Sequence, residues 1–401
     1  MANVGLVMSG GGARAAYQVG AVQALAEMLR GQSSPFNVFA GLSAGAINCA
    51  ALASHADDFA RASALLIDTW TSLTPEAVYR TEGTKLAGLG LRWIKDLTMG
   101  GVLGASRANY LLDNAPLREL LARRLELRRI PEHVCSGALR GVAVSATNYL
   151  TGTIVSFYDG APEIKPWHRY DRIAFRESLT LDHVMASAAI PIFFPPVSIN
   201  GRLFGDGGVR MTTPVSPAIH LGADKILAIG IRYARSSEQT LKLNREACAE
   251  FVSVAQIGGV LLNALFLDSL DNDLERLQRI NRTLGFIPDE ARKNHPDFLR
   301  RIPALSLRPS QDLGRLAATE YQRFPAMLRH LLRGIGAAGD SGWDLLSYLA
   351  FQPGYIGRLM ELGYQDTLAR RAEIEAFFEA PADGISASAF AAPPTGEPPH
   401  R

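Results

Sequence analysis

The sequence has few cysteines, little net charge and no metal-binding motif. Its three cysteines, Cys49, Cys135 and Cys248, are too few for a disulfide framework, which suits a reducing compartment. The 41 basic and 39 acidic residues leave a net charge of +2, so composition gives no reason to expect a nucleic-acid partner. Because the chain has no His-x-x-x-His pair, EF-hand loop or zinc-spaced cysteine cluster, we expect neither a metal nor another cofactor.

Long uninterrupted apolar runs are also absent. Segment 251–267 carries no charge, but two glycines and three polar residues interrupt it, and it is short for a membrane span. It predicts a buried or interfacial helix. Near the N-terminus Arg14 interrupts the apolar stretches and no basic region precedes them, so a signal peptide is not predicted. We therefore expect a cytoplasmic protein, at most peripheral on the inner face of a membrane.

The most informative segment is Gly-Leu-Ser-Ala-Gly at residues 41–45, directly after the apolar residues 36–40. Small residues around Ser43, with Gly41 and Gly45 at the ends, let a strand turn sharply into a helix and expose the serine hydroxyl at the helix N-terminus. Alone, the five residues also fit an ordinary glycine-rich helix cap. A predicted strand at 36–40 and a predicted buried helix at 44–53 favour a nucleophile elbow.

A glycine run follows the strand-like residues 4–8 and opens a helical stretch from about residue 13 to 30. Gly10, Gly11 and Gly12 leave backbone N–H groups open at a positive helix end, which suits an oxyanion or a phosphate. With Ala15 the run also fits a dinucleotide-binding fingerprint, which needs an acidic residue near the end of the next strand. That strand runs into the elbow instead, so we do not expect a nicotinamide or flavin cofactor.

A third glycine-rich segment, Phe-Gly-Asp-Gly-Gly at 204–208, places Asp206 in a tight turn with Gly207 and Gly208. By itself an Asp-Gly turn is ordinary. Together with Ser43 and the glycine run, it adds a base to a nucleophile and an anion hole.

These three segments, in this order, resemble the patatin-like phospholipase family. That family has a glycine-rich oxyanion loop, a G-x-S-x-G serine and an Asp-Gly-Gly or Asp-Gly-Ala aspartate, and it works with a Ser-Asp dyad. The block Ala-Ser-Ala-Ala-Ile-Pro at 186–191 also resembles the segment before the family's aspartate strand. The resemblance covers about residues 4–232. It implies catalytic Ser43 and Asp206, an oxyanion hole at Gly10, Gly11 and Gly12, and supporting roles for Arg14, Gly41, Gly45, Gly207 and Gly208.

Two positions depart from the family pattern. Ala15 stands where the glycine loop usually has another glycine, and Thr213 stands before Pro214 where the family often has asparagine. Neither change removes a group that takes part in the chemistry. Both bear on the rate and on how a substrate fits.

The resemblance implies a three-layer α/β fold, with a central, mostly parallel sheet flanked by helices and a helical C-terminal extension. The alternation of strand-like and helical stretches predicts the same wound arrangement. At 401 residues and 47% hydrophobic content, the chain can bury a sizeable core. We predict a catalytic domain at 1–235, an extension of helices alone at 236–379 and a disordered tail at 380–401. The predicted strands are 4–8, 36–40, 141–146, 153–157, 202–204 and 226–231.

Residues 69–130 form a predicted insertion in the catalytic domain. The stretch 69–109, rich in Gly, Leu and Trp, fits either a surface excursion with its own apolar cluster or a mobile flap over an acyl site. The next helix has Leu117, Leu120, Leu121 and Leu125 on one face and arginines elsewhere. We favour solvated arginines on its outer face; an amphipathic helix on an anionic membrane is the alternative.

The implied activity is hydrolysis of fatty-acyl esters of phospholipids or other lipids. Asp206 accepts the Ser43 proton, the glycine loop holds the oxyanion, and an acyl-enzyme forms. An ordinary aspartate pKa of about 3.9 makes a weak base at neutral pH, so we expect burial to raise it. A transacylase on the same dyad and a non-catalytic membrane- or partner-binding module remain alternatives.

A Ser-Asp-His triad would need a histidine after Asp206. The candidates are His220, His295 and His330, and none lies in a turn-rich segment that would present its ring to Ser43. We therefore predict a dyad.

Overall fold

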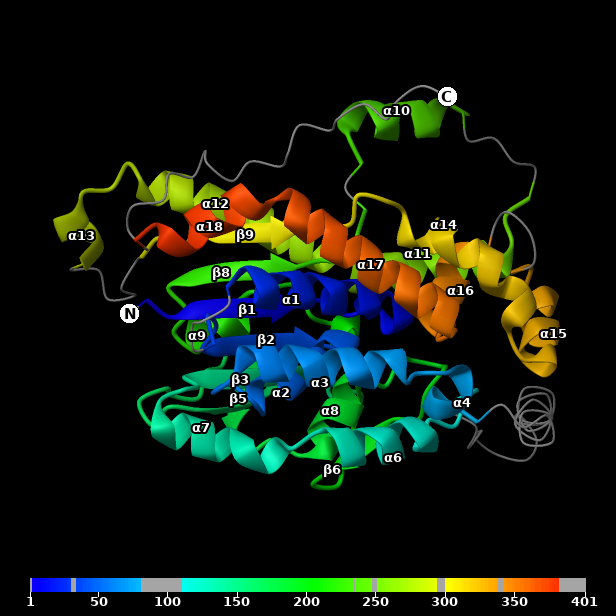
Figure 1. Cartoon of the computed structure of the whole chain (residues 1–401), viewed down its shortest axis with the longest axis horizontal. Coiled ribbons are helices and arrows are strands. Elements are labelled where there is room, and N and C mark those ends of the chain that lie inside the picture. Colours follow the sequence, from blue (N-terminus) through cyan, green and yellow to red (C-terminus); the bar gives the residue numbers. More distant parts are fainter. Residues whose placement is uncertain are drawn as a thin grey trace.

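A computed structural model describes residues 2–29, 34–80, 110–233, 235–246, 251–293, 300–337 and 342–381. Within these ranges a nine-stranded sheet lies between two layers of helices (Figure 1). The strands are β1 (Val4–Met8), β2 (Val38–Leu42), β3 (Gly141–Asn148), β4 (Ile154–Gly160), β5 (Arg172–Arg176), β6 (Val197–Ile199), β7 (Arg202–Asp206), β8 (Lys225–Ile229) and β9 (Ala304–Leu307).

The sheet order is β5-β4-β3-β2-β1-β8-β9, with β7 paired to both β3 and β6. From β3 across to β9 the strands run parallel, whereas β4 and β7 are antiparallel to β3. The central strands read as continuous apolar runs because both of their faces are covered. The carboxyl ends of β1 and β2, where Met8 pairs with Gly41, therefore meet at one edge of the sheet.

Helices fill the two outer layers. Alternate strand residues face opposite layers, so Leu6 and Phe39 join one core while Val7 and Val38 join the other. Helices α1, α2, α3 and α17 cover the first core, and α9 and α12 cover the second. The helices described before α10 are α1 (Ala16–Met28), α2 (Ala44–Ala53), α3 (Phe59–Thr71), α4 (Pro75–Val78), α6 (Ala115–Arg124), α7 (Ile130–Ser136), α8 (Leu181–Ser187) and α9 (Ser216–His220).

The C-terminal region is mostly helical, as predicted. Its helices are α10 (Ser237–Glu246), α11 (Val254–Phe266), α12 (Asp268–Leu284), α13 (Asp289–Lys293), α14 (Leu313–Ala317), α15 (Ala326–Gly334), α16 (Trp343–Leu349), α17 (Pro353–Ala369) and α18 (Arg371–Glu379). The expectation of helices alone after residue 235 is nevertheless wrong, because β9 pairs with β8 at the edge of the central sheet. The sheet therefore continues past the boundary predicted at 235.

Helix α17 crosses α1 at very close range. A Cβ at Gly20 would lie 1.7 Å from the Met360 carbonyl oxygen, and one at Gly363 would lie 2.0 Å from the Tyr17 carbonyl oxygen. Only glycine allows the two backbones to approach this closely. The end of the chain is thereby packed against the helix that follows the glycine loop.

Several boundaries differ from the predictions. Strand β2 starts at Val38 and runs on to Leu42, because its hydrogen bonds with β1 and β3 continue up to the elbow. The helix expected from residue 13 begins as a 3-10 turn, η1 (Gly12–Ala15), before α1. Strands β5 and β6 were not predicted. Residues 81–109 of the predicted flap, nearly all of the predicted tail, Cys248 and His295 lie outside the described residues.

Candidate active site

Ser43 lies between β2 and α2 in a strained backbone conformation. Its φ is 52° and its ψ is −130°, a region that residues other than glycine rarely adopt. The turn also needs its glycines, since a Cβ at Gly41 would lie 2.4 Å from the Gly45 oxygen and one at Gly45 would lie 2.5 Å from the Met8 oxygen. This geometry is that of a nucleophile elbow, with the serine at the N-terminal end of α2.

A buried serine from α8 holds the elbow in place. The Ser43 backbone N–H donates to Ser187 Oγ at 3.0 Å, and Ser187 Oγ donates to the Ser145 carbonyl at 2.7 Å. Ser187 belongs to the Ala-Ser-Ala-Ala-Ile-Pro block. The strained conformation is therefore tied to the end of α8 and to β3.

The same block also fixes Asp206, which is the last residue of β7 and fully buried. The Asp206 backbone N–H donates to the Ala189 carbonyl at 3.0 Å, and Thr147 Oγ1 donates to the Asp206 carbonyl at 2.8 Å. Two residues apart in sequence, Ser187 and Ala189 thus position both members of the predicted dyad.

The environment of Asp206 suits a base. Burial raises the pKa of its carboxyl to about 7, although the Ser43 hydroxyl and the Gly208 N–H act in the opposite direction. The Gly208 N–H donates to Oδ1 at 2.8 Å, whereas Oδ2 has no well-formed hydrogen bond in the described part of the chain.

The glycine loop packs directly on the elbow. A Cβ at Gly10 would lie 2.6 Å from Ser43 Cβ and 3.4 Å from Ser43 Oγ. Within the described residues, the N–H groups of Gly10 and Gly11 donate no hydrogen bond. The adjoining η1 and α1 and the nearby α2 all begin here, so their positive ends converge beside the serine. Open N–H groups in such a place suit a developing oxyanion.

The Arg14 side chain connects the glycine loop to the C-terminal region. Its guanidinium donates to Ser347 at 2.6 Å, to Asn263 at 3.2 Å and to the Asp344 carboxylate at 2.8 Å. It also lies 4.4 Å from the ring centre of Tyr348. All four partners come from α11 and α16. None of them belongs to the sequence motifs between residues 4 and 232 on which the supporting role of Arg14 was predicted.

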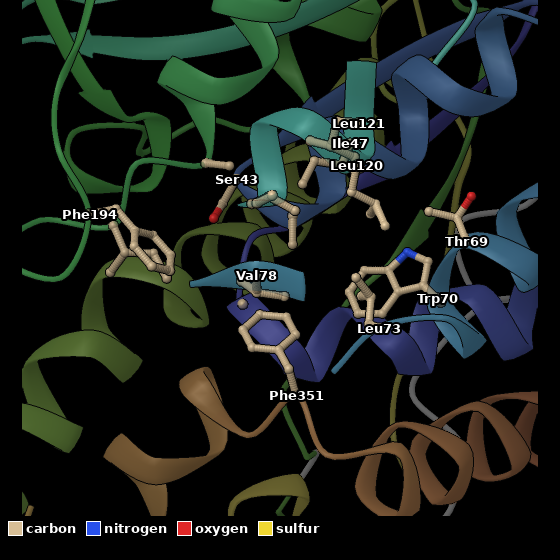
Figure 2. A pocket seen from close by; sticks show the side chains of 15 residues that line it. Ser43, Ile47, Thr69, Trp70, Leu73, Val78, Leu120, Leu121, Phe194 and Phe351 are labelled. Carbon is tan, nitrogen blue, oxygen red and sulfur yellow. The ribbon is translucent and has the colours of Figure 1, made fainter. Parts of the chain in front are cut away.

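A pocket of about 490 Å³, counting its open mouth, adjoins Ser43. Among the described residues that line it, Ser43 and Thr69 alone carry hydroxyl groups, and the indole nitrogen of Trp70 already donates to Asn48 Oδ1 at 2.8 Å. Figure 2 shows Ser43 and Phe194 at one end and Trp70 at the other. Such an apolar cavity suits an acyl chain. Its lining is Gly12, Ser43, Ala44, Ile47, Thr69, Trp70, Leu73, Val78, Leu117, Leu120, Leu121, Ala188, Ile190, Phe194 and Phe351.

A buried amide pair links the pocket wall to the glycine loop. Asn48, which holds Trp70, donates through Nδ2 to Gln18 Oε1 at 3.0 Å. Gln18 Nε2 in turn donates to the carbonyls of Ser9, at 2.9 Å, and Ile229, at 3.2 Å. The wall and the loop are thus parts of one hydrogen-bonded unit.

The described histidine candidates for a triad lie elsewhere. The His220 ring stacks on Trp167 with centroids 4.6 Å apart, and burial, together with Arg169 and Arg172, lowers its pKa to about 4. His330 is exposed on α15. Neither lines the pocket, and no group of three or more metal-ligating side chains occurs among the described residues.

Sequence patterns did not reveal several residues at the site. The sequence predicts the leucine face of α6, but it does not predict that this face forms part of the pocket wall. It also gives no indication that Phe351 lines the pocket. The α6 arginines do fit the solvated interpretation, because Arg118 pairs with Asp182 at 2.6 Å and Arg124 with Asp68 at 2.5 Å. Trp70 lies at the start of segment 69–109, for which a mobile flap is one interpretation. The richness of that segment in Trp and Leu is the sequence signal that points to a pocket wall.

A strained serine beside a buried carboxyl, at the carboxyl edge of a mostly parallel sheet, is typical of an α/β acyl hydrolase. The family model described as patatin-like phospholipase matches residues 6–219, more than half of the chain. The chain belongs to this family, and it is accordingly a lipid acyl hydrolase. The absence of an acidic residue at the end of β2 agrees with this assignment rather than with dinucleotide binding.

Among solved structures, the chain is similar to VipD from Legionella pneumophila. The sequence identity is 14%, the TM-score is 0.37, and the match covers 93% of this chain and 67% of VipD. It is also similar to ExoU of the type III secretion system of Pseudomonas aeruginosa, solved in complex with SpcU. There the identity is 16%, the TM-score is 0.25, and the coverage is 93% of this chain and 78% of the other. These likenesses are distant, and the assignment rests on the family match.

Proposed function

We propose that the protein cleaves fatty-acyl esters of phospholipids or related lipids through a Ser43–Asp206 dyad and an acyl-enzyme. The observation that carries the proposal is the placement of Asp206, a fully buried carboxyl held by Ala189 two residues from the Ser187 that holds the strained Ser43; burial raises its pKa to about 7. A general base works best when its pKa lies near the ambient pH. Among the described residues that line the pocket, none is a histidine.

In this mechanism Asp206 takes the Ser43 hydroxyl proton as Oγ attacks the ester carbonyl carbon. The N–H groups of the loop from Gly10 to Gly12 stabilise the resulting oxyanion. When the tetrahedral intermediate collapses, the carbon–oxygen bond to the alcohol breaks and Asp206 returns the proton to the leaving oxygen. Asp206 then deprotonates a water that attacks the acyl-enzyme, which releases the fatty acid and restores Ser43.

The pocket supports an acyl substrate. It places an almost wholly apolar lining beside Ser43, so a hydrocarbon chain fits there better than a polar headgroup. The headgroup would then remain on the outer side of the serine.

A serine-directed fluorophosphonate and a panel of phospholipids, triacylglycerols and short-chain esters test the dyad. Ser43→Ala should lose both labelling and hydrolysis, and Asp206→Asn should lose hydrolysis, with circular dichroism showing both proteins folded. As a matched control, Ser54→Ala removes a buried hydroxyl at the other end of α2 and should retain activity. Undiminished hydrolysis by folded Ser43→Ala would refute the proposal.

Three further comparisons separate the dyad from its alternatives. His220→Ala, His295→Ala and His330→Ala should each retain most of the activity, because the proposed proton transfer needs no imidazole. A chelator should leave turnover unchanged, because the dyad needs no metal-bound water. Product analysis separates hydrolysis, which yields free fatty acid, from transfer of the acyl group to an added alcohol.

A further inference from the structure

Helix α11 carries apolar side chains on two opposite faces. The inward face, formed by Ala255, Gly259, Leu262 and Phe266, is buried against α16 and the turn η3 (Gly207–Val209). No residue from 251 to 267 is charged. A helix without a polar face is typical of a buried element or of one that meets a membrane.

The outward face of α11 is exposed. Its large side chains are each more than half exposed, up to 78% for Phe251. Within the helix they recur at spacings of three and four, so they lie along one side. We call this surface the α11 ridge, consisting of Phe251, Val252, Val254, Ile257, Val260 and Leu261. Contiguous apolar surface of this kind marks an interaction site.

A cationic helix, α15, ends next to the start of α11. The Ala255 N–H donates to the Ile335 carbonyl at 2.9 Å, which joins the start of α11 to the end of α15. The α15 sequence contains Arg329, His330 and Arg333 but no acidic residue, and Arg333 is exposed. An apolar surface next to a cationic helix fits a bilayer that contains anionic lipids. In a pairing of two copies through this ridge, the same charges would repel one another.

The opposite, inward face of α11 packs against the candidate active site. Phe266, on the inward face, is so near the glycine turns that a Cβ at Gly208 would lie 2.4 Å from its ring and one at Gly10 would lie 3.3 Å from it. By length and composition the run Val254–Leu284 could cross a membrane. Its second half, α12, instead packs Leu270 and Leu274 into the sheet core, which favours α11 lying along a membrane surface.

We propose that the α11 ridge inserts into the interfacial layer of a membrane with anionic lipids and holds the pocket next to its substrate. The inference rests on the proposed lipid hydrolysis, and it names the surface that brings the enzyme to its substrate. Binding and catalysis can be measured separately, so either can fail alone.

The test is co-sedimentation with phosphatidylcholine vesicles, prepared with and without phosphatidylglycerol. Binding is measured in the Ser43→Ala background so that the vesicles stay intact. The double variant Ile257→Gln/Val260→Gln should bind at least about tenfold more weakly, because it removes apolar area without adding charge. Ile280→Gln, which changes a half-exposed isoleucine on α12, is the matched control and should bind normally. Arg333→Gln should weaken binding only to vesicles that contain phosphatidylglycerol.

Hydrolysis of a soluble short-chain ester, measured with Ser43 intact, should be the same in the double variant and the wild type. Equal vesicle binding by the double variant and its parent would overturn the proposal. So would a dimer in sedimentation velocity that the double variant dissociates while vesicle binding is unchanged, since the ridge would then be a contact between copies. If the wild type binds vesicles but hydrolyses no ester, the proposed function fails and the docking surface stands.

Discussion

Asp206 is the residue whose ionisation should govern turnover. Burial raises its pKa to about 7, and the proposed base acts only when it is deprotonated. The kcat/KM for a soluble ester, which reports the ionisation of the free enzyme, should therefore rise with pH through about 7 and level off above it. A profile of kcat/KM against pH checks this, with Asp206→Asn as the control that should stay near background at every pH. A plateau that already begins near pH 5 would assign the base to a group of ordinary acidity.

The same raised pKa has a cost in stability. A carboxyl whose pKa is higher in the folded state holds its proton there, while the unfolded chain releases it above about pH 3.9. The free energy of unfolding should therefore fall as pH rises from about 4 to 7, and the penalty persists above 7. Asp206→Asn should be more stable than the wild type at pH 8, and the gain should shrink towards pH 4. Urea unfolding at the two pH values measures the difference.

Ser187 should affect catalysis without touching substrate. Its hydroxyl accepts the Ser43 N–H, so Ser187→Ala removes a contact that holds the strained elbow. We expect kcat for a soluble ester to fall about tenfold, the equivalent of one hydrogen bond, with little change in KM. Ser54→Ala removes a similarly buried hydroxyl that lies away from the elbow, so this variant should leave kcat unchanged. Equal kcat values for the two variants would limit Ser187 to a structural role.

At this scale the sequence indicates candidate residues with reactive groups more readily than the residues that position them. Ser43 and Asp206 stand in glycine-rich turns, and turns that demand glycine leave a visible pattern. Ser187 and Ala189 act through one hydroxyl and one carbonyl, which almost any helix end could supply. The block at 186–191 marked their segment, but it could not show which atoms act, because their roles depend on contacts between distant segments.

At the scale of elements, the crossing of α1 and α17 depends on two glycines. Gly363→Ala would drive a Cβ into the Tyr17 carbonyl and should destabilise the protein by about 1–3 kcal/mol or more. Gly357→Ala, on the same helix, meets nothing within 4 Å and should stabilise it by about 0.5–1 kcal/mol. Thermal unfolding of the two single variants supplies the comparison. Stabilisation by both variants would show that helix propensity, rather than the close crossing, controls stability at these positions.

Apolar runs predicted the long central elements well. Strand β1 and helix α2 match their predicted bounds, because each is an apolar segment bounded by glycine or polar residues. Strand β9 was missed because Ala-Leu-Ser-Leu is short and precedes a segment of helices. It becomes a strand only because β8 offers it an open edge.

At the scale of the whole molecule, the Arg14 contacts make the C-terminal region part of the site. Asp344→Asn weakens the ion pair that holds the glycine loop and should lower kcat about tenfold. A double-mutant cycle with Arg14→Lys should show strong non-additivity in kcat. Asp182→Asn disrupts a half-exposed pair with Arg118 and should have little effect. Additive losses in the cycle would mean that the two residues act independently.

During synthesis Arg14 is added to the chain early, and Asp344 follows it 330 residues later in the sequence. While the chain is being synthesised, the segment that contains both Ser43 and Asp206 therefore exists before the groups that hold its oxyanion loop. Phe351, which lines the pocket, also emerges after them. A ribosome-bound chain thus carries the proposed nucleophile and base without a finished site. The proposed lipid cleavage should therefore begin only once the segment that contains Asp344 and Phe351 has emerged and folded.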